Sequence, residues 1–134
     1  MKRIMSKNQS FCFLLVLFCC LLLPALSMAE GLTARYLENS EKLSVLELII
    51  ENPAPTSIIV KQHIPPKTRI VNANPSVTKF AVGKGEVTWL IKAPRPGVQR
   101  IQLQYEKSLS GRKATAVIRC KSPLDGRLMT INVK

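Results

Sequence analysis

The chain has 134 residues, which are too few for two domains of common size and enough for one. Lysine and arginine number 20 against eight aspartate and glutamate residues, so the formal net charge is +12 at pH 7. This basic balance is typical either of a soluble positive surface or of a protein that attracts anionic partners. The presence of a single histidine and a single aspartate disfavours acid–base catalysis.

The amino terminus predicts a secretory signal peptide that spans residues 1–29. A basic start, MKRIMSK, precedes the apolar run FCFLLVLFCCLLLPAL at residues 11–26, and the small residues Ser27–Ala29 follow it. A basic segment, a short apolar run and small residues at the cut site are the order of an export signal. We therefore expect cleavage after Ala29.

Two other interpretations of the amino terminus stay open but are disfavoured. An uncleaved membrane anchor needs about 20 apolar residues, whereas this run has about 16 and Pro24 interrupts it near its end. A lipid-anchored cysteine would follow small residues, whereas Cys19 and Cys20 lie inside the run behind the bulky Phe18. We expect an exported protein that is periplasmic, extracellular or at the cell surface.

Residues 30–134 remain after cleavage and are expected to form one domain. Their formal charge is about +9, because all eight acidic residues lie beyond residue 29. Three of the four cysteines leave with the signal, so Cys120 alone remains and no internal disulfide can form. A lone cysteine on a strand is usually a small buried apolar residue.

Alternation of apolar and polar residues predicts strands along most of this domain. The segment VQRIQLQYEK shows it most clearly, since Ile101, Leu103 and Tyr105 alternate with arginine and glutamine. A strand sends alternate side chains to opposite faces, so each such segment can cover a core on one side. The predicted strands are 32–37, 42–52, 56–64, 86–92, 98–107, 113–120 and 127–133. Short strands at this spacing predict an all-β antiparallel sandwich of about seven to eight strands.

Prolines bracket one of these strands. The stretch ENPAPTSIIVKQHIPPKTRIV has Pro53 and Pro55 before a run of β-branched residues, and Pro65 and Pro66 after it. A disordered proline-rich segment would be poor in such residues. Proline lacks the donor that a sheet requires, so it belongs at strand ends and edges. We expect a strand over 56–64 and a corner at the second proline pair, before KTRIV.

The inward positions of the predicted strands define the expected core. Trp89 occupies the centre of strand 86–92, between Val87 and Ile91 on the same side. The expected core comprises Leu46, Leu48, Ile50, Ile58, Val60, Val87, Trp89, Ile91, Ile101, Leu103, Tyr105, Ala116, Ile118, Met129, Ile131 and Val133.

The order of short motifs in this region is distinctive. A strand ends in residues 52–55 (Asn-Pro-Ala-Pro), an Ile-Pro-Pro corner follows at 64–66, a later strand carries the central Trp89, and Pro96-Gly97 opens an alternating strand. This order resembles the conserved immunoglobulin-like repeat of bacterial surface proteins called domain of unknown function eleven, over about residues 42–106. The resemblance implies an immunoglobulin-like sandwich in an exported bacterial protein, and that family carries no known catalytic residues.

No catalytic, cofactor-binding or metal-binding set is expected. His63 and Asp125 lie in different segments, and Asp125 belongs to an ordinary Asp-Gly turn. A metal site needs three or four close ligands, and His63 and Cys120 show no such spacing. The GKG sequence at 83–85 lacks the frame of a phosphate-binding loop. We expect a protein that is not an enzyme; a small hydrolase that uses His63 is the disfavoured alternative.

The surplus of positive charge has three interpretations. It can keep strand edges from pairing with other molecules, or it can attract an anionic partner by long-range steering. Nucleic acid is disfavoured, because Trp89 and Tyr105 fall on core faces rather than on a stacking surface. The candidate basic contact face comprises Arg100, Lys107, Arg112, Lys113, Arg119 and Lys121.

These observations predict a non-catalytic interaction or adhesion module of the bacterial envelope. Its partner would be an envelope protein or an anionic surface polymer, bound through a strand edge or the basic face. Contact with a membrane would come only from an uncleaved signal or from charge attraction. The alternative is a structural subunit of a surface filament or appendage, and either function is compatible with homo- or hetero-oligomers.

Overall fold

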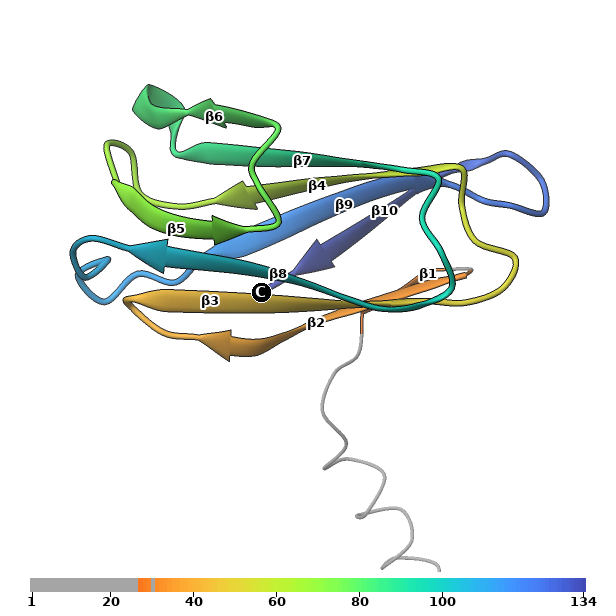
Figure 1. Cartoon of the computed structure of the whole chain (residues 1–134), viewed down its shortest axis with the longest axis horizontal. Coiled ribbons are helices and arrows are strands. Elements are labelled where there is room, and N and C mark those ends of the chain that lie inside the picture. Colours follow the sequence, from red (N-terminus) through yellow and green to blue (C-terminus); the bar gives the residue numbers. More distant parts are fainter. Residues whose placement is uncertain (1–26, 30) are drawn as a thin grey trace, which may run out of the picture.

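A computed structural model describes residues 27–29 and 31–134, so most of the predicted signal peptide lies outside the described residues. Two five-stranded antiparallel sheets pack face to face, which confirms the expected all-β sandwich (Figure 1). Sheet A contains, in spatial order, β1 (Ser27–Ala29), β2 (Leu32–Asn39), β3 (Leu43–Ile50), β8 (Gly97–Tyr105) and β5 (Ile70–Asn74). Sheet B contains β10 (Leu128–Val133), β9 (Thr115–Lys121), β4 (Ser57–His63), β7 (Glu86–Lys92) and β6 (Lys79–Ala81). One short 3-10 turn, η1 (Val82–Lys84), links β6 to β7.

The number of strands differs from the expected seven to eight. Ten strands are present in the part of the chain that the structure describes. All seven predicted segments form strands, and the three additional strands are β1, β5 and β6. Each of the three has five residues or fewer and lies at a sheet edge. Edge strands are often short, and these three are too short to show the long alternating pattern that marks the predicted strands.

The spatial order of the strands matches that of an immunoglobulin-type sandwich. Strands β2, β3, β8 and β5 occupy the places of A, B, E and D, and β4, β9 and β10 occupy those of C, F and G. Strands β7 and β6 extend sheet B beyond β4. Because β5 precedes β6 and β7 in sequence, the chain crosses to the edge of sheet A before it returns to complete sheet B (Figure 1).

Cross-strand register aligns the apolar sides of neighbouring strands. In sheet A, Leu46 lies opposite Ile101, and both are fully buried between the sheets. The next pair, Glu47 and Arg100, points to the outward side. Of the expected core residues, all are buried except Ile91 and Met129, which are partly buried and pack against the others. The core also contains Leu32, Ala34, Ile64 and Leu109.

Trp89 closes the side of the sandwich where the chain crosses from β5 to β6. Its side chain is 1% exposed, and its indole Nε1–H donates a hydrogen bond to the carbonyl oxygen of Pro75 at 3.0 Å. Pro75 lies in the crossing segment between the two strands (Figure 1). The buried indole therefore fills the core and also fixes the segment that covers this side.

Replacing Trp89 with alanine should lower the free energy of unfolding by about 3–5 kcal/mol, because it leaves a cavity in the core. The matched control is Leu90→Ala, since Leu90 follows directly in β7 but is 40% exposed. We expect the control to change that free energy by about 1 kcal/mol or less. Urea unfolding measures both, and equal midpoints for the two variants would contradict the placement of Trp89.

Candidate anion-binding site

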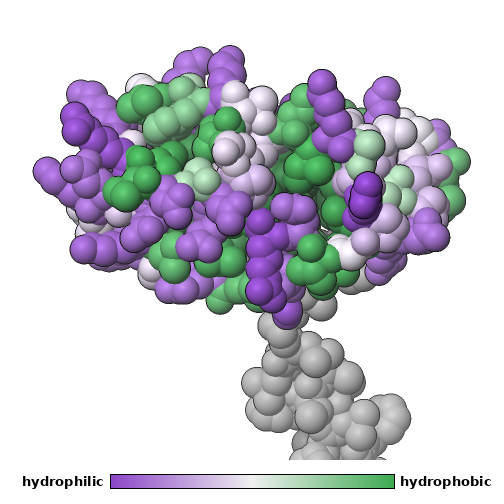
Figure 2. Space-filling view, in the orientation of Figure 1, coloured by the Kyte–Doolittle hydropathy of each residue, from purple (hydrophilic) through white to green (hydrophobic). Residues whose placement is uncertain are grey.

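Two loops form an open pocket at one end of the sandwich. One loop follows β4 and the other follows β8, and both lie at the left end in Figure 1. The pocket has a volume of about 690 Å³. We call it the basic pocket; it is lined by Pro65, Pro66, Lys67, Thr68, Arg69, Glu106, Lys107, Ser108, Leu109, Ser110 and Arg112. In Figure 2 hydrophilic side chains crowd this end of the molecule.

The lining of the basic pocket is strongly positive. Lys67, Arg69, Lys107 and Arg112 supply four cations, and among the described residues that line it Glu106 is the only carboxylate. A carboxylate oxygen of Glu106 lies 4.0 Å from the guanidinium Nε of Arg69, and both side chains are largely exposed. An exposed ion pair of this kind is weak. The pocket therefore retains a surplus of positive charge that faces solvent.

The loop after β4 is held against η1. Ile64 donates its backbone N–H to the carbonyl oxygen of Gly85 at 2.8 Å, and Lys67 donates to Val82 at 3.0 Å. Gly85 has φ +64, and a Cβ there would lie 2.0 Å from the Ile64 carbonyl oxygen. Only glycine permits this approach. Lys67 itself has φ +66, a left-handed conformation that is uncommon for a residue with a side chain.

The loop after β8 is anchored by a buried leucine. Leu109 is 4% exposed and donates its N–H to the carbonyl oxygen of Glu41 at 2.9 Å. The Ser108 hydroxyl donates to the carboxylate of Glu41. Arg112 donates its backbone N–H to Leu109 at 3.3 Å. These contacts hold Arg112 on a loop whose centre is fixed in the core, so the pocket is built on two supported loops.

A buried polar network lies between the sheets near the strand ends that carry these loops. The Tyr36 hydroxyl donates to Gln62 Oε1 at 3.1 Å, and the Ser44 hydroxyl lies 3.4 Å from the same oxygen. The Tyr105 hydroxyl donates to Ser44 Oγ at 3.0 Å. Gln62 is fully buried, and its Nε2 has no hydrogen-bond partner among the residues that the structure describes. Alternation places Gln62 on the inward side of β4 together with Ile58 and Val60. The sequence pattern could therefore have predicted that Gln62 is buried.

Burial raises the pKa of the Tyr36 hydroxyl well above its usual value, and the neighbouring Tyr105 adds to the effect. Burial also raises the pKa of Tyr105, partly opposed by its hydrogen bond to Ser44. Both hydroxyls are therefore kept protonated and act as donors in the folded chain.

The six residues of the predicted basic contact face lie on three surfaces. Lys107 and Arg112 line the basic pocket, and Lys113 follows them in the same loop. Arg119 and Lys121 point outward from β9 in sheet B. Arg100 points outward from β8 in sheet A, on the opposite side of the sandwich. The structure thus brings the three loop residues together and separates Arg100 from the rest.

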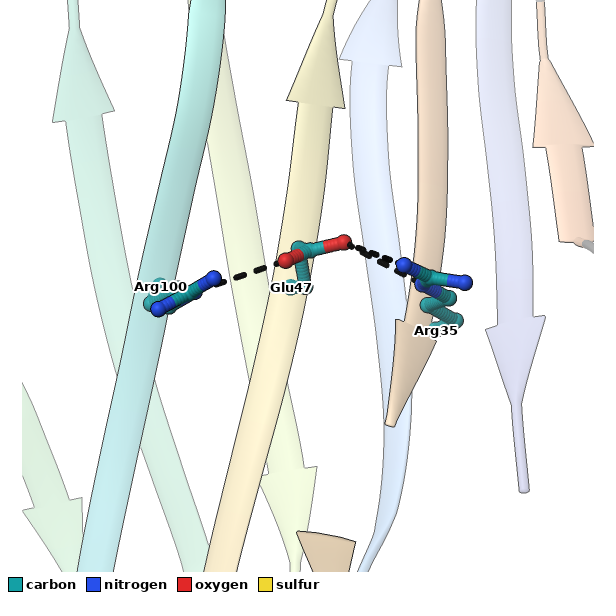
Figure 3. Close-up of polar contacts among 3 residues, drawn as sticks. All are labelled: Arg35, Glu47 and Arg100. Carbon is teal, nitrogen blue, oxygen red and sulfur yellow. Dashed lines mark hydrogen bonds and ion pairs between the residues drawn. The ribbon is translucent and has the colours of Figure 1, made fainter. Parts of the chain in front are cut away.

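Arg100 belongs to a row of charges that crosses sheet A (Figure 3). The carboxylate of Glu47 accepts from Arg35 at 3.0 Å and from Arg100 at 3.4 Å. Glu47 is only 5% exposed although it lies on the outward side of the sheet, because the two guanidinium groups cover it. Cross-strand pairs of opposite charge stabilise a sheet by about 0.2–1 kcal/mol each. Arg100 therefore joins β8 to β3 through an ion pair with Glu47.

Neither His63 nor Cys120 lines the basic pocket. His63 is exposed at the end of β4, opposite Thr115 in β9 and Glu86 in β7. Cys120 is buried on the inward side of β9, and burial raises the pKa of its thiol. No group of three or more His, Cys, Asp or Glu side chains suited to a metal ion lies within the described residues. The chemistry that the pocket offers is the binding of anions by guanidinium and ammonium groups.

In comparisons with known proteins, no family model, no curated protein and no solved structure matches this chain. The resemblance to domain of unknown function eleven therefore stays a prediction. Within the described residues, no helix has the length and apolar character needed to cross a membrane.

The partly buried Tyr36 and the buried Tyr105 predict a loss of stability in alkali. In the unfolded chain a tyrosine ionises near pH 10, whereas Tyr36 keeps its proton in the folded state. Above about pH 10 the unfolded state binds fewer protons, so the free energy of unfolding falls by up to about 1.4 kcal/mol per pH unit for each buried tyrosine. Urea midpoints between about pH 9 and 11.5 should fall less steeply in Tyr36→Phe. An unchanged slope in that variant would contradict the effect of burial.

Proposed function

We propose that this chain is an exported, non-catalytic interaction module of the bacterial envelope that binds an anionic surface polymer in the basic pocket. The observation that carries the proposal is the gathering of four cationic side chains around one pocket with a single carboxylate. Loops on a rigid sandwich commonly carry binding residues. An acidic envelope protein is the other partner with this chemistry, and the binding experiment below separates the two.

The lining residues suit a flexible polyanion. Guanidinium groups bind carboxylate, sulfate or phosphate oxygens in a bidentate fork, and Arg69 and Arg112 contribute one such group from each loop. Lys67 and Lys107 add compact charges beside them. All four side chains belong to exposed residues, so a chain with repeated anionic groups can lie across the pocket without being enclosed. The hydroxyl of Ser110 supplies a further polar contact at the rim, whereas that of Ser108 is engaged with the carboxylate of Glu41.

The double variant Lys107→Ala with Arg112→Ala should weaken binding of a sulfated polysaccharide, dextran sulfate, by about two- to thirtyfold, since an exposed ion pair contributes about 0.2–1 kcal/mol. Calorimetric titration of residues 30–134 measures the affinity; this segment retains every core residue from Leu32 to Val133. Neutral dextran should not bind.

The matched control removes the same charge at the opposite end. Arg95→Ala with Arg127→Ala changes two exposed arginines in the loops after β7 and β9 (Figure 1). Its affinity should stay within about twofold of the unmodified chain. If both double variants lose affinity equally, overall charge rather than the pocket governs binding. If dextran sulfate does not bind but an acidic protein from the envelope does, the polymer is the wrong partner.

A second candidate function, a structural subunit of a surface filament, is favoured by the edge of sheet A. Ser27, Met28 and Ala29 in β1 pair with Ala34, Thr33 and Leu32 in β2. Predicted signal cleavage follows Ala29, so a cleaved chain would lose β1. The matching stretch of β2 would then lack a neighbour, and unpaired edge groups are a template for a strand from another molecule.

Assembly tests this second candidate. As a filament subunit, residues 30–134 should show a mass that rises with concentration in analytical ultracentrifugation, and polymers should be visible by electron microscopy. A matched chain that begins at Ser27 keeps β1, so it should assemble less. A monomer at every concentration would contradict the filament function and would leave the interaction module as the only candidate.

A further inference from the structure

The outward face of sheet B carries a second concentration of positive charge, separate from the basic pocket. We call it the sheet B face. Its basic residues are Lys61, Lys79, Lys92, Arg119 and Lys121, one or more from each of β4, β6, β7 and β9. Among the outward positions of the five strands of sheet B, Glu86 is the only acid, and it lies 3.4 Å from Lys61 Nζ. Four cations on this face therefore have no ion-pair partner among its residues.

Aliphatic side chains lie between these cations. The register aligns Arg119, Ile59 and Leu90 in one row across β9, β4 and β7. Ile59 is 36% exposed and Leu90 is 40% exposed, at the middle of the face. At the edge strand β10, Leu128 is 66% exposed and lies opposite Lys121. The face thus alternates long basic side chains with solvent-exposed aliphatic ones.

The outward face of sheet A differs in charge. There Glu47 is held between Arg35 and Arg100, so the charges of that row are engaged with each other. The rest of that face is largely uncharged, as in the pairs Val45 with Gln102 and Ile49 with Val98. The sandwich therefore presents one broad basic face rather than an even positive surface.

We propose that the sheet B face docks on a lipid bilayer that contains anionic phospholipids. A sheet face is broad and gently twisted, which suits an extended surface better than a single polymer chain. Lysine side chains reach out to lipid phosphates while their stems cover apolar surface. Exposed Ile59, Leu90 and Leu128 can contact the boundary between headgroups and acyl chains. This contact leaves the basic pocket at the end of the sandwich accessible to its own partner.

Vesicle binding tests the proposal. Residues 30–134 should be used, because they exclude the apolar amino-terminal run from the assay while keeping the core. We expect sedimentation with vesicles that contain phosphatidylglycerol and none with pure phosphatidylcholine. Arg119→Glu with Lys121→Glu should weaken vesicle binding at least about thirtyfold, because each basic residue near an anionic membrane adds substantially to the binding free energy. Both side chains point outward and are exposed, so circular dichroism should report an intact fold.

A variant of the basic pocket separates the two surfaces. Lys107→Glu with Arg112→Glu makes the same change of charge, and it should lose dextran sulfate binding while vesicle binding stays within about threefold. Arg119→Glu with Lys121→Glu should lose vesicle binding and keep dextran sulfate binding. Equal binding to neutral and anionic vesicles, an unaffected Arg119 and Lys121 variant, or complete release by millimolar inorganic phosphate would overturn the bilayer proposal. If the unmodified chain binds anionic vesicles but not dextran sulfate, the proposed function of the pocket fails and the bilayer proposal stands.

Discussion

The core and both faces of this sandwich depend on the two-residue alternation of its strands. Inward positions meet in a core in which Trp89, Leu46 and Ile101 are buried. Side chains at outward positions do not pack in the core, so charged residues there do not disturb it. A shift of one residue in register would exchange the two sets, and the buried side would then have to accept lysine and arginine. The same constraint thus fixes the core and determines which residues can contact other molecules.

The charges at the outward positions differ between the two sheets. Sheet A pairs its central charges within one row, where Glu47 lies between two arginines. Sheet B leaves most of its lysines and Arg119 without a carboxylate on the same face. The loops at the end add four more cations around the basic pocket. Such one-sided charge orients a molecule toward an anionic surface before contact, because the field extends about one Debye length, roughly 8–10 Å.

The sequence was sufficient to predict the seven principal strands, because alternation is a local pattern that survives without tertiary information. It did not reveal β5 and β6, which are short and contain polar residues such as Asn72, Asn74 and Lys79. The basic contact face was predicted as one set, but alternation does not say which sheet a strand joins. Arg100 and Arg119 both occupy outward positions, yet β8 lies in sheet A and β9 in sheet B. The pocket was missed because its two loops are about 40 residues apart and meet only in the folded chain.

The most direct test of this arrangement is to map where a polyanion contacts the folded domain. Residues 30–134 labelled with ¹⁵N can be titrated with short dextran sulfate while the amide resonances are followed. The largest changes should fall in residues 65–69 and 106–113, and the outward positions of β2, β3 and β8 should remain unperturbed. Changes centred on the row that contains Glu47, or spread evenly over the surface, would contradict a binding site built from the two end loops.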